Sequence, residues 1–402
     1  MFGTQPKIIT DKENIEEILE RGRDEIVDKG HLEERLKSGK QLRIKLGIDP
    51  TSPNIHIGRA VVLWKLRAFQ DMGHIAVLII GDFTGLVGDT SDKSSERPML
   101  TEEQVKSNMQ NYLEQAFKIL DSEKTEIHYN SEWLKKLGFM EVAKMAELFG
   151  LHEFESREVI SRRMKDGKRV SLREILYPLM QGYDSVAVKA DVELGGSDQW
   201  FNLLAGRSIQ TLYKQEPQDI LTMHLLEGTD KRKMSSSWGN VINITDEPND
   251  MFGKVMSIYD GEDGLVIRRY LERATRIPMD EVKELENNLK NGVNPRDIKK
   301  RLAEEIVALY YGKEVAKKAS NEWENVFSKK ELPENIQKFA GEGQSILDFI
   351  ADNNLAESRS EAKRLLEQKA VKVNLETVID WGQALSKGDI VQVGPRKFAK
   401  VK

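Results

Sequence analysis

His56 and Gly58 have the residue types and spacing of a phosphate-binding turn. They lie in the segment PNIHIGR, between a strand predicted at residues 42–49 and a helix predicted at residues 57–72. Open parallel sheets bind ligands at the carboxyl ends of their strands, and the free N–H groups at a helix N-terminus attract phosphate. His56 is able to donate to a phosphoryl oxygen, and Gly58 leaves room for a flat base on the backbone. The alternative is a turn histidine in a tight contact between helix and strand.

A glycine-rich loop follows the next predicted strand, at residues 75–81. Its segment GDFTGLVGD ends at Asp89, which leaves the same edge of the sheet and is a candidate partner for a substrate cation. Lys93 and Arg97 come next on a polar loop and are candidates to clamp phosphates. A solvated loop with incidental charges is the alternative.

Three hydrogen-bonding side chains share one face of a helix predicted at residues 173–189. Tyr177, Gln181 and Asp184, in the segment YPLMQGYD, recur at positions i, i+4 and i+7. The rest of this helix is largely apolar. The three side chains therefore indicate a polar pocket and argue against the alternative of a solvent-facing stripe.

Two further segments carry residue types that suit a nucleotide. In GGSDQW, residues 195–200, the glycine pair lets the backbone approach a ligand, and Asp198 is able to accept from ribose hydroxyls. A simple helix N-cap at Ser197 or Asp198 explains the same pattern. In KRKMSSS, residues 231–237, cations and hydroxyls on one loop suit the neutralisation of pyrophosphate. A charged surface loop is the alternative.

A parallel sheet is needed to bring these segments together. Strand, loop, helix and strand within about forty residues predict a βαβ unit. The alternation continues with helices predicted at 102–120, 133–149, 173–189 and 201–213, and strands at 126–130 and 220–226. The predicted fold class is α/β, with a Rossmann-like parallel-sheet domain, an α-helical domain and a small α+β domain. The expected boundaries are a helical N-terminal segment at 1–30 with its helix over 14–29, the α/β domain at 31–228, the basic loop at 229–247, the helical domain at 248–328, a linker at 329–343 and the α+β domain at 344–402.

The composition excludes several classes of site. The 402 residues include no cysteine, which rules out disulfides, thiolate zinc sites, iron–sulfur clusters and a cysteine nucleophile. The six histidines show no metal-ligand spacing, so we expect no metal site. The longest apolar stretch, residues 75–80, is too short for a membrane span, and no secretory signal is visible, so we expect a cytoplasmic protein. The net charge of −5 argues against a general nucleic-acid coat, although the C-terminal segment has a small excess of basic residues.

Taken together, in this order and spacing, the segments resemble the class I aminoacyl-tRNA synthetases. HIGR, residues 56–59, is similar to their HIGH motif, and KMSSS, residues 233–237, to their KMSKS motif. GDFTGLVGD, YPLMQGYD and GGSDQW are similar to segments of bacterial-type tyrosyl-tRNA synthetases. The C-terminal SRSEAKRLLEQKAVKVN and GDIVQVGPRKF resemble the ribosomal-protein-S-four-type RNA-binding domain. The resemblance covers almost the whole chain.

The resemblance implies a reaction and a set of partners. Tyrosine is activated with ATP to tyrosyl adenylate and pyrophosphate, and is then transferred to the 3′ end of tRNA(Tyr). Mg²⁺ is expected to accompany ATP, no organic cofactor is expected to be bound, and the family suggests a homodimer. The helical domain is expected to bind the anticodon region.

The family's residue roles transfer only to matching positions. The implied catalytic residues are His56, Lys93, Arg97, Lys233 and Thr51. The implied tyrosine-binding residues are Asp89, Tyr177, Gln181, Asp184 and Gln199. The implied ATP-binding residues are Asp49, Gly58, Arg59, Gly196, Asp198, Lys233, Ser235 and Ser236. The implied tRNA-binding residues are Arg359, Lys363, Arg364 and Lys369, on about one helix.

Three positions depart from the family pattern. Arg59 replaces the second histidine of HIGH, and Ser236 replaces the second lysine of KMSKS, where Lys231 or Arg232 is the expected compensation. Lys45 stands where many of these enzymes place a second tyrosine for the substrate phenol. The competing interpretations are a tryptophanyl enzyme, an RNA-binding relative that no longer activates amino acid, and a nucleotidyltransferase that shares the HIGH-type fold.

Overall fold

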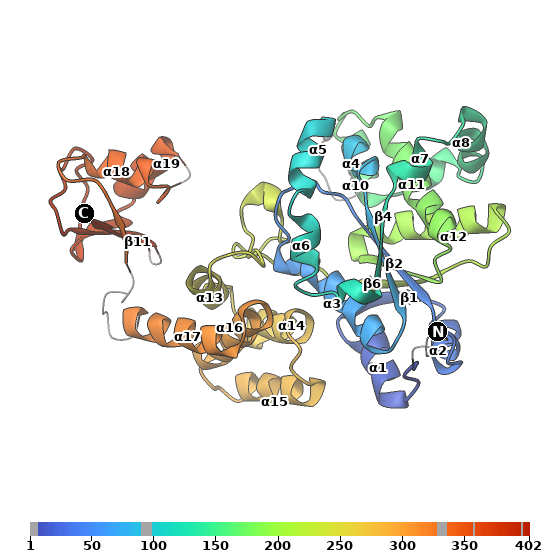
Figure 1. Cartoon of the computed structure of the whole chain (residues 1–402), viewed down its shortest axis with the longest axis horizontal. Coiled ribbons are helices and arrows are strands. Elements are labelled where there is room, and N and C mark those ends of the chain that lie inside the picture. The colour runs from blue at the N-terminus through green and yellow to red at the C-terminus, as the bar shows by residue number, and fades with distance from the viewer. Residues whose placement is uncertain (1–6, 90–98, 328–335, 357, 395–396) are drawn as a thin grey trace.

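The computed structural model describes residues 7–89, 99–327, 336–356, 358–394 and 397–402. Figure 1 shows an α/β region that contains the larger sheet, a group of helices beside it, and a small unit at the C-terminal end of the molecule. No described helix is long and apolar enough to cross a membrane.

The larger sheet has six strands in the order β1-β6-β5-β2-β3-β4. Neighbouring strands are parallel except for β1, which pairs antiparallel with β6 at one edge. The strands are β1 (Arg23–Val27), β2 (Arg43–Ile48), β3 (Ile75–Ile80), β4 (Thr125–Tyr129), β5 (Val192–Gly196) and β6 (Asp219–Met223). The predicted α/β class is confirmed.

Both faces of this sheet are covered, as a nearly all-parallel sheet requires. Along β3, Ala76, Leu78 and Ile80 join the same buried cluster as α3, while Val77 and Ile79 pack with Val188 at the end of α11. The helices of this region are α1 (Lys12–Glu20), α2 (Lys29–Lys37), α3 (Ile57–Asp71), α4 (Thr84–Val87), α5 (Glu102–Met109), α6 (Tyr112–Ala116), α7 (Ser131–Leu134), α8 (Phe139–Ala146), α9 (Leu151–Glu155), α10 (Glu158–Lys165), α11 (Leu172–Val188) and α12 (Trp200–Leu212). Single 3₁₀ turns lie at Ser122–Lys124, Ser197–Gln199, Ser236–Trp238 and Glu262–Gly264.

Some predicted elements are wrong in extent. The helix expected over 14–29 ends at Glu20, because Gly22 takes a positive φ of 62° and the next five residues pair with β6 as β1. The helix expected over 102–120 is broken at Asn111, whose φ of −116° is not helical, and the one expected over 133–149 is interrupted before Gly138. Strand β5 and helices α2, α9 and α10 were not predicted.

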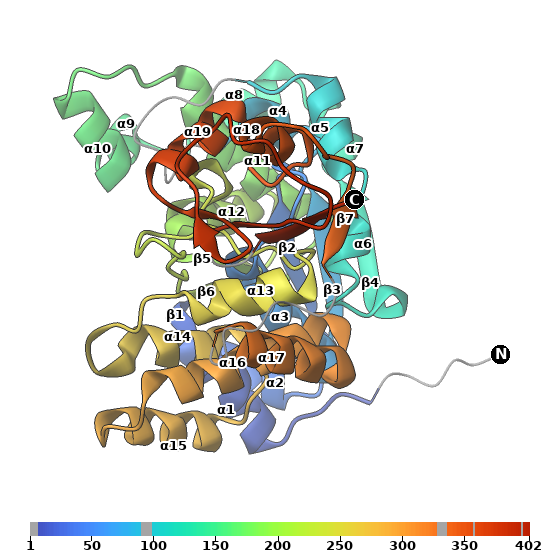
Figure 2. The ribbon, with the colours of Figure 1, turned by 90° about the vertical axis from the view of Figure 1, so that its left-hand side faces the viewer.

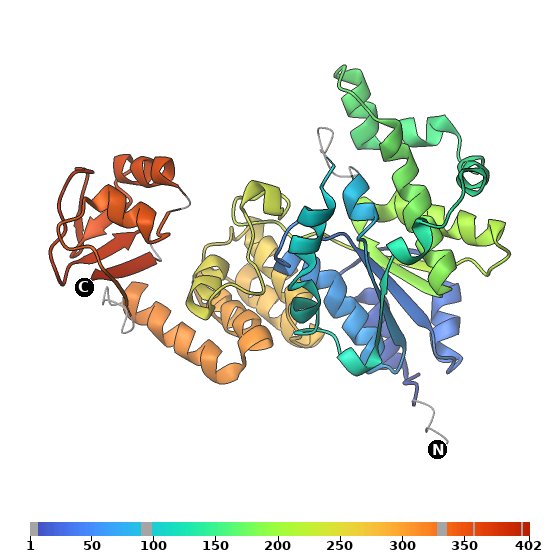
Figure 3. The same cartoon turned by 45° about the horizontal axis from the view of Figure 1, so that its top comes forward.

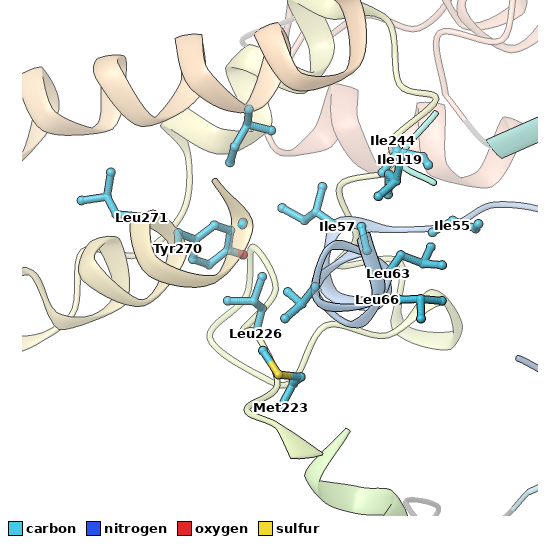
Figure 4. Close-up of a cluster of buried hydrophobic side chains, with 14 of the residues drawn as sticks. Ile55, Ile57, Leu63, Leu66, Ile119, Met223, Leu226, Ile244, Tyr270 and Leu271 are labelled. Atoms are coloured by element: carbon cyan, nitrogen blue, oxygen red, sulfur yellow. The ribbon is translucent and has the colours of Figure 1, made fainter. Parts of the chain in front are cut away.

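The helical region follows the basic loop, as predicted. It contains α13 (Pro248–Met256), α14 (Leu265–Ala274), α15 (Met279–Lys290), α16 (Pro295–Tyr311) and α17 (Lys313–Phe327). Figure 2 shows these helices, in yellow to orange, gathered below the sheet. In Figure 4, Ile57 and Leu66 of α3 lie opposite Tyr270 of α14, with Leu226 close by. The two regions therefore share one continuous core, which fixes the loop between them.

The C-terminal unit has a core of its own. Its five-stranded sheet has the order β7-β11-β10-β8-β9, and its buried residues form a separate cluster. The unit stands apart beyond α17 in Figures 1 and 3. Its elements are β7 (Gln337–Phe339), α18 (Ile346–Asp352), α19 (Arg359–Glu367), β8 (Val371–Val373), β9 (Glu376–Thr377), β10 (Ile390–Val393) and β11 (Lys397–Val401). Strand β7 belongs to this sheet, so the unit begins inside the expected linker at 329–343, of which 329–335 lie outside the described residues.

Candidate active site

A cavity of about 450 Å³ opens at the carboxyl ends of β2, β3 and β5. It gathers predicted residues from five separate segments of the chain. Those that line it are Asp49, Thr51, His56, Gly58, Arg59, Asp89, Tyr177, Gln181, Asp184, Gly196, Asp198, Gln199, Lys233, Ser235 and Ser236. Lys93 and Arg97 lie outside the described residues. The topology thus brings the predicted site together at one edge of the sheet.

His56 caps the helix that begins beside the cavity. The backbone N–H of Arg59 donates to Nδ1 of His56 over 3.3 Å, so the ring proton belongs on Nε2. Burial and the neighbouring cations Arg59 and Lys233 lower the pKa of His56 to about 3. His56 is therefore neutral at physiological pH and has an N–H to offer.

The KMSSS loop is docked onto this turn. The Ile57 N–H donates to the Ile242 carbonyl over 2.8 Å, and the Ile244 N–H to the Ile55 carbonyl over 2.9 Å. A Cβ at Gly58 would lie 3.4 Å from Sδ of Met234 and 3.1 Å from the His56 ring. Glycine at position 58 thus avoids a tight contact with the His56 ring, whereas the contact with Met234 would be an ordinary one.

Lys233 is the loop cation that faces the cavity. Its Nζ donates to Oδ2 of Asp198 over 2.9 Å, so the two predicted ATP-binding residues form an ion pair. Lys231 lies over the ring of Tyr259 at 4.1 Å, and Arg232 bonds to Asp230. Neither Lys231 nor Arg232 lines the cavity among the residues described, and the expected compensation for Ser236 by these two side chains stays a prediction.

Arg59 lies at the same end of the cavity as Lys233, on the opposite wall. Its guanidinium donates to the Tyr112 hydroxyl over 2.8 Å and to Oγ1 of Thr51 over 2.9 Å. Ser236 lies beside this wall, with its Oγ 3.4 Å from Oγ of Ser52. The two departures from the family motifs therefore face the same part of the cavity.

Asp49 holds a second group of side chains. Its carboxylate accepts from the Tyr177 hydroxyl over 2.8 Å and from Oγ1 of Thr84 over 2.7 Å. Burial raises the pKa of Asp49 to about 6, against the lowering effect of these hydrogen bonds. A Cβ at Gly81 would overlap Oδ1 of Asp49, so glycine is required there. Asp49 thus orients Tyr177, a role that sequence reasoning did not assign.

Asp89 and Gln199 are joined across the cavity. Nε2 of Gln199 donates to Oδ2 of Asp89 over 2.6 Å, and its Oε1 accepts from Asn202 over 3.0 Å. This chain links the loop after β3 to the start of α12. An acidic side chain is thereby fixed at the cavity wall, where a cation can meet it.

Asp184 lies at the deep end and is only 3% exposed. Nε1 of Trp133 donates to its Oδ1 over 2.7 Å, and Nδ2 of Asn130 to its Oδ2 over 3.2 Å. Burial raises the pKa of Asp184 to about 7, although Lys45 and the two donors act in the opposite direction. Sequence reasoning missed Trp133 and Asn130. The signal was that Asn130 ends a predicted parallel strand, where side chains meet the cavity.

Lys45 does not take the place of a phenol-binding side chain. It is fully buried, and its Nζ lies 2.8 Å from Oε1 of Glu193 in an ion pair below the cavity. The two residues are direct partners in the register of β2 and β5. Glu193 was also missed, and the available signal was that it is the lone charge in the sequence VELGG of β5.

The four candidate RNA-binding residues lie in the C-terminal unit. Arg359, Lys363 and Arg364 are on α19, whereas Lys369 follows its end with a positive φ of 59°. The expectation of one helix is therefore wrong for Lys369. Nζ of Lys363 lies 4.0 Å from the centre of the Trp381 ring, and Arg359 pairs with Asp348. A helix rich in cations is thus presented beside an exposed tryptophan.

Comparisons with known proteins place this geometry in a family. The family described as tRNA synthetases class I (W and Y) matches residues 37–328. A tyrosine–tRNA ligase of Carboxydothermus hydrogenoformans is 46% identical over 401 residues, covering 96% of this chain and 97% of that protein. One of Thermotoga maritima is 44% identical over 389 residues and covers 96% of each chain.

Solved structures agree in fold. The tyrosyl-tRNA synthetase of Archaeoglobus fulgidus, complexed with L-tyrosine, has a TM-score of 0.62 at 22% identity, covering 77% of this chain and 99% of that one. A C-terminally truncated mitochondrial tyrosyl-tRNA synthetase of Aspergillus nidulans has a TM-score of 0.64 at 22% identity, covering 79% of this chain and 95% of that one. At such identity the likeness concerns the fold alone.

Proposed function

This chain belongs to the class I tRNA synthetases and, within them, to the tyrosine–tRNA ligases, and from that premise we propose how its cavity works. Tyrosine occupies the end at Asp184, and ATP occupies the end between the HIGR turn and the KMSSS loop. The enzyme joins tyrosine to AMP with release of pyrophosphate, and then transfers tyrosine to the 3′ end of tRNA(Tyr).

The tyrosine end offers a partner for each polar group of the substrate. Asp184 accepts from the phenol, and its carboxylate is oriented by Trp133 and Asn130. The substrate ammonium group meets Asp89, the Tyr177 hydroxyl and the Gln181 side chain, all of which line the cavity. Gln199, fixed by Asp89, lies near the reacting carboxylate.

At the ATP end, the proposed roles follow the ion pair that Lys233 forms with Asp198. Gly196 and Asp198 receive the adenosine and its ribose, with Gly58 leaving space for the base. Asp49 was expected at the nucleotide. Because its oxygens hold Tyr177 and Thr84, we assign it a positioning role instead.

The reaction needs positioning and charge stabilisation, and no covalent intermediate with the enzyme. The tyrosine carboxylate attacks the α-phosphorus in line, and the bond to pyrophosphate breaks. The Nε2–H of His56, the guanidinium of Arg59 and the Thr51 hydroxyl donate to phosphoryl oxygens, and Lys233 leaves Asp198 to meet the pyrophosphate, with Ser235 and Ser236 beside it. Lys93 and Arg97 are assigned to the phosphates from the sequence. Mg²⁺ would accompany ATP and supply positive charge to its phosphates; among the described residues, no group of three or more His, Asp or Glu side chains is placed to hold a metal ion.

The observation that carries this proposal is the buried Asp184 at the end of the cavity, held by Trp133 and Asn130. The test is exchange of labelled pyrophosphate into ATP with tyrosine, phenylalanine or tryptophan. We expect exchange with tyrosine. Exchange with tryptophan alone would assign the tryptophanyl reaction, and no exchange with any amino acid would leave an RNA-binding relative.

The C-terminal unit is proposed to bind tRNA through Arg359, Lys363, Arg364 and Lys369, and the helical region to bind near the anticodon. A protein truncated after residue 335 should keep pyrophosphate exchange and lose charging of tRNA. The loss should shrink as salt is added, because phosphate contacts weaken with ionic strength. Equal charging by both proteins at every salt concentration would contradict this role.

A second copy of the chain is the proposed partner of an apolar surface on α9 to α11. Leu151, Met164 and Leu172 are 60%, 47% and 78% exposed, and they line a cavity of about 200 Å³. Exposed apolar patches of this kind mark protein interfaces. Sedimentation equilibrium should show a homodimer that Leu172→Glu weakens, and a wild-type monomer at all concentrations would refute it.

We propose that the enzyme works in the cytoplasm, where protein synthesis uses its product.

A further inference from the structure

A buried ion pair lies directly beneath the tyrosine end of the cavity. Lys45 of β2 and Glu193 of β5 face each other in register, and the exposed fraction of each side chain is 0%. Among the described residues that line the cavity are their neighbours Leu46 and Leu194, but neither Lys45 nor Glu193. The pair therefore acts on substrate only through other residues.

Lys45 is bonded to the turn of α11 that carries the tyrosine site. Its Nζ donates to the main-chain carbonyl of Gln181 over 2.9 Å and to Oγ of Ser185 over 2.7 Å. Asp184 lies between these two contacts on the same turn of helix. Any movement of the Lys45 ammonium group would thus move the Asp184 backbone.

Glu193 holds the other side of the same turn. Its Oε1 accepts from Nε2 of Gln181 over 3.2 Å, and its Oε2 accepts from Oγ of Ser185 over 3.0 Å and from Nε2 of Gln218. The side-chain NH₂ group of Gln181 donates to Glu193. The side-chain oxygen of Gln181, Oε1, is therefore the atom left to accept from a ligand. That orientation suits an ammonium group.

Stability alone does not account for this pair. Removing two charges from water costs several kcal/mol per ion, and buried pairs replaced by apolar side chains of similar volume are often as stable or more stable. We propose that Lys45 and Glu193 are positioning residues for amino-acid recognition, which fix the α11 turn and point the Gln181 oxygen at the substrate ammonium group. This inference rests on the proposed tyrosine site.

The charges of the pair also act on Asp184. The groups that face it are Lys45, Glu193 and Tyr177, together with the donors Trp133 and Asn130. Lys45 lowers the pKa of Asp184 more than Glu193 raises it. Neutralising both residues should therefore raise that pKa, an effect that a purely mechanical role of the pair would not produce.

The test is the double variant Lys45→Met/Glu193→Gln in the full-length chain, which leaves no buried charge unpaired. We expect the KM for tyrosine to rise about 10-fold, the cost of one hydrogen bond to a charged group, with the KM for ATP within about 2-fold of wild type. The pH below which the KM for tyrosine rises should also move upward. Ser185→Ala removes a contact with both charges at little risk to folding, and should raise the KM for tyrosine about 3-fold.

A matched control is another ion pair with both side chains buried, Arg163 of α10 with Glu174 of α11, which does not line the cavity among the described residues. Each of these side chains is 1% exposed, and Arg163→Met/Glu174→Gln should leave both KM values near wild type. Wild-type KM for tyrosine in the Lys45/Glu193 and Ser185 variants would overturn the inference, as would equal changes in the control. A wild-type enzyme without tyrosine-dependent exchange would instead refute the proposed function.

Discussion

The two ends of the cavity differ in what holds their functional side chains. At the tyrosine end, Asp184 and Tyr177 sit on one long helix, where Asp184 is bonded to Trp133 of α7 and Tyr177 to Asp49, which follows β2. At the phosphate end, Lys233 lies on a loop and is paired with Asp198, both about a quarter exposed. In the proposed mechanism, recognition is therefore built into the fold, whereas Lys233 exchanges Asp198 for pyrophosphate as charge develops.

The largest expected effect tests the built-in end. Asp184→Ala should lower kcat/KM for tyrosine and leave that for phenylalanine nearly unchanged. The site that hydrogen-bonds a hydroxyl rejects an analogue without it because a buried polar group is left unpaired, and losing a charged partner is worth about 100-fold. Pyrophosphate exchange with each amino acid measures the ratio. If the ratio survives, the hydroxyl is recognised elsewhere and the assignment of the deep end is wrong.

A second effect tests the exchangeable end. Lys233→Ala should slow adenylate formation about 100-fold, or roughly 3 kcal/mol, while the dissociation constant of tyrosine stays near wild type. The reason is that a loop cation meets new charge only as pyrophosphate separates. Single-turnover rates with saturating ATP measure it, and an unchanged rate would remove Lys233 from the chemical step.

The sequence predicts functional residues that share one local segment, but it does not predict contacts between distant segments. The spacing of Tyr177, Gln181 and Asp184 on one helix predicts a polar face, and the strand ends predict where the loops meet. The ion pair beneath them was not predicted, because β5 is short and the role of its Glu193 becomes clear only once Lys45 is known to lie opposite. Contacts between distant segments, such as Trp133 with Asp184, are set by packing and are invisible in local patterns.

A smaller effect comes from pH and separates two carboxylates. The KM for tyrosine should rise as pH falls through about 7, where burial places the pKa of Asp184, because the protonated acid no longer accepts as an anion. The Asp184→Asn variant should lose this dependence. A remaining change near pH 6 belongs to Asp49, whose pKa burial raises to about 6.

The same shift has a consequence for folding. The pKa of Asp184 is raised from 3.8, so its contribution to stability is fully present below that pH and is lost as pH rises through about 7. His56 acts in the opposite direction: its pKa is lowered from 6.5 to about 3, so its contribution is present above pH 6.5 and is lost as pH falls toward 3, because only the unfolded histidine binds a proton there. For tyrosine binding, the prediction of the preceding paragraph, a KM for tyrosine that stays constant between pH 5 and pH 8 in the wild-type enzyme would contradict the role of ionised Asp184.

The smallest effect concerns the missing lysine of the loop. Ser236 lines the cavity beside Ser52, and Arg59 on the same side already brings a permanent charge that a histidine would lack. If Ser236 leaves the phosphate end short of a cation, Ser236→Lys should speed adenylate formation a few-fold, as one partly exposed charge allows. The gain should be larger in the Arg59→His background, because the two cations then no longer serve the same phosphates. Single-turnover rates of the four proteins form a double-mutant cycle. A slower Ser236→Lys enzyme in both backgrounds would mean that the loop is built around serine, and that the phosphate end is as fixed as the tyrosine end.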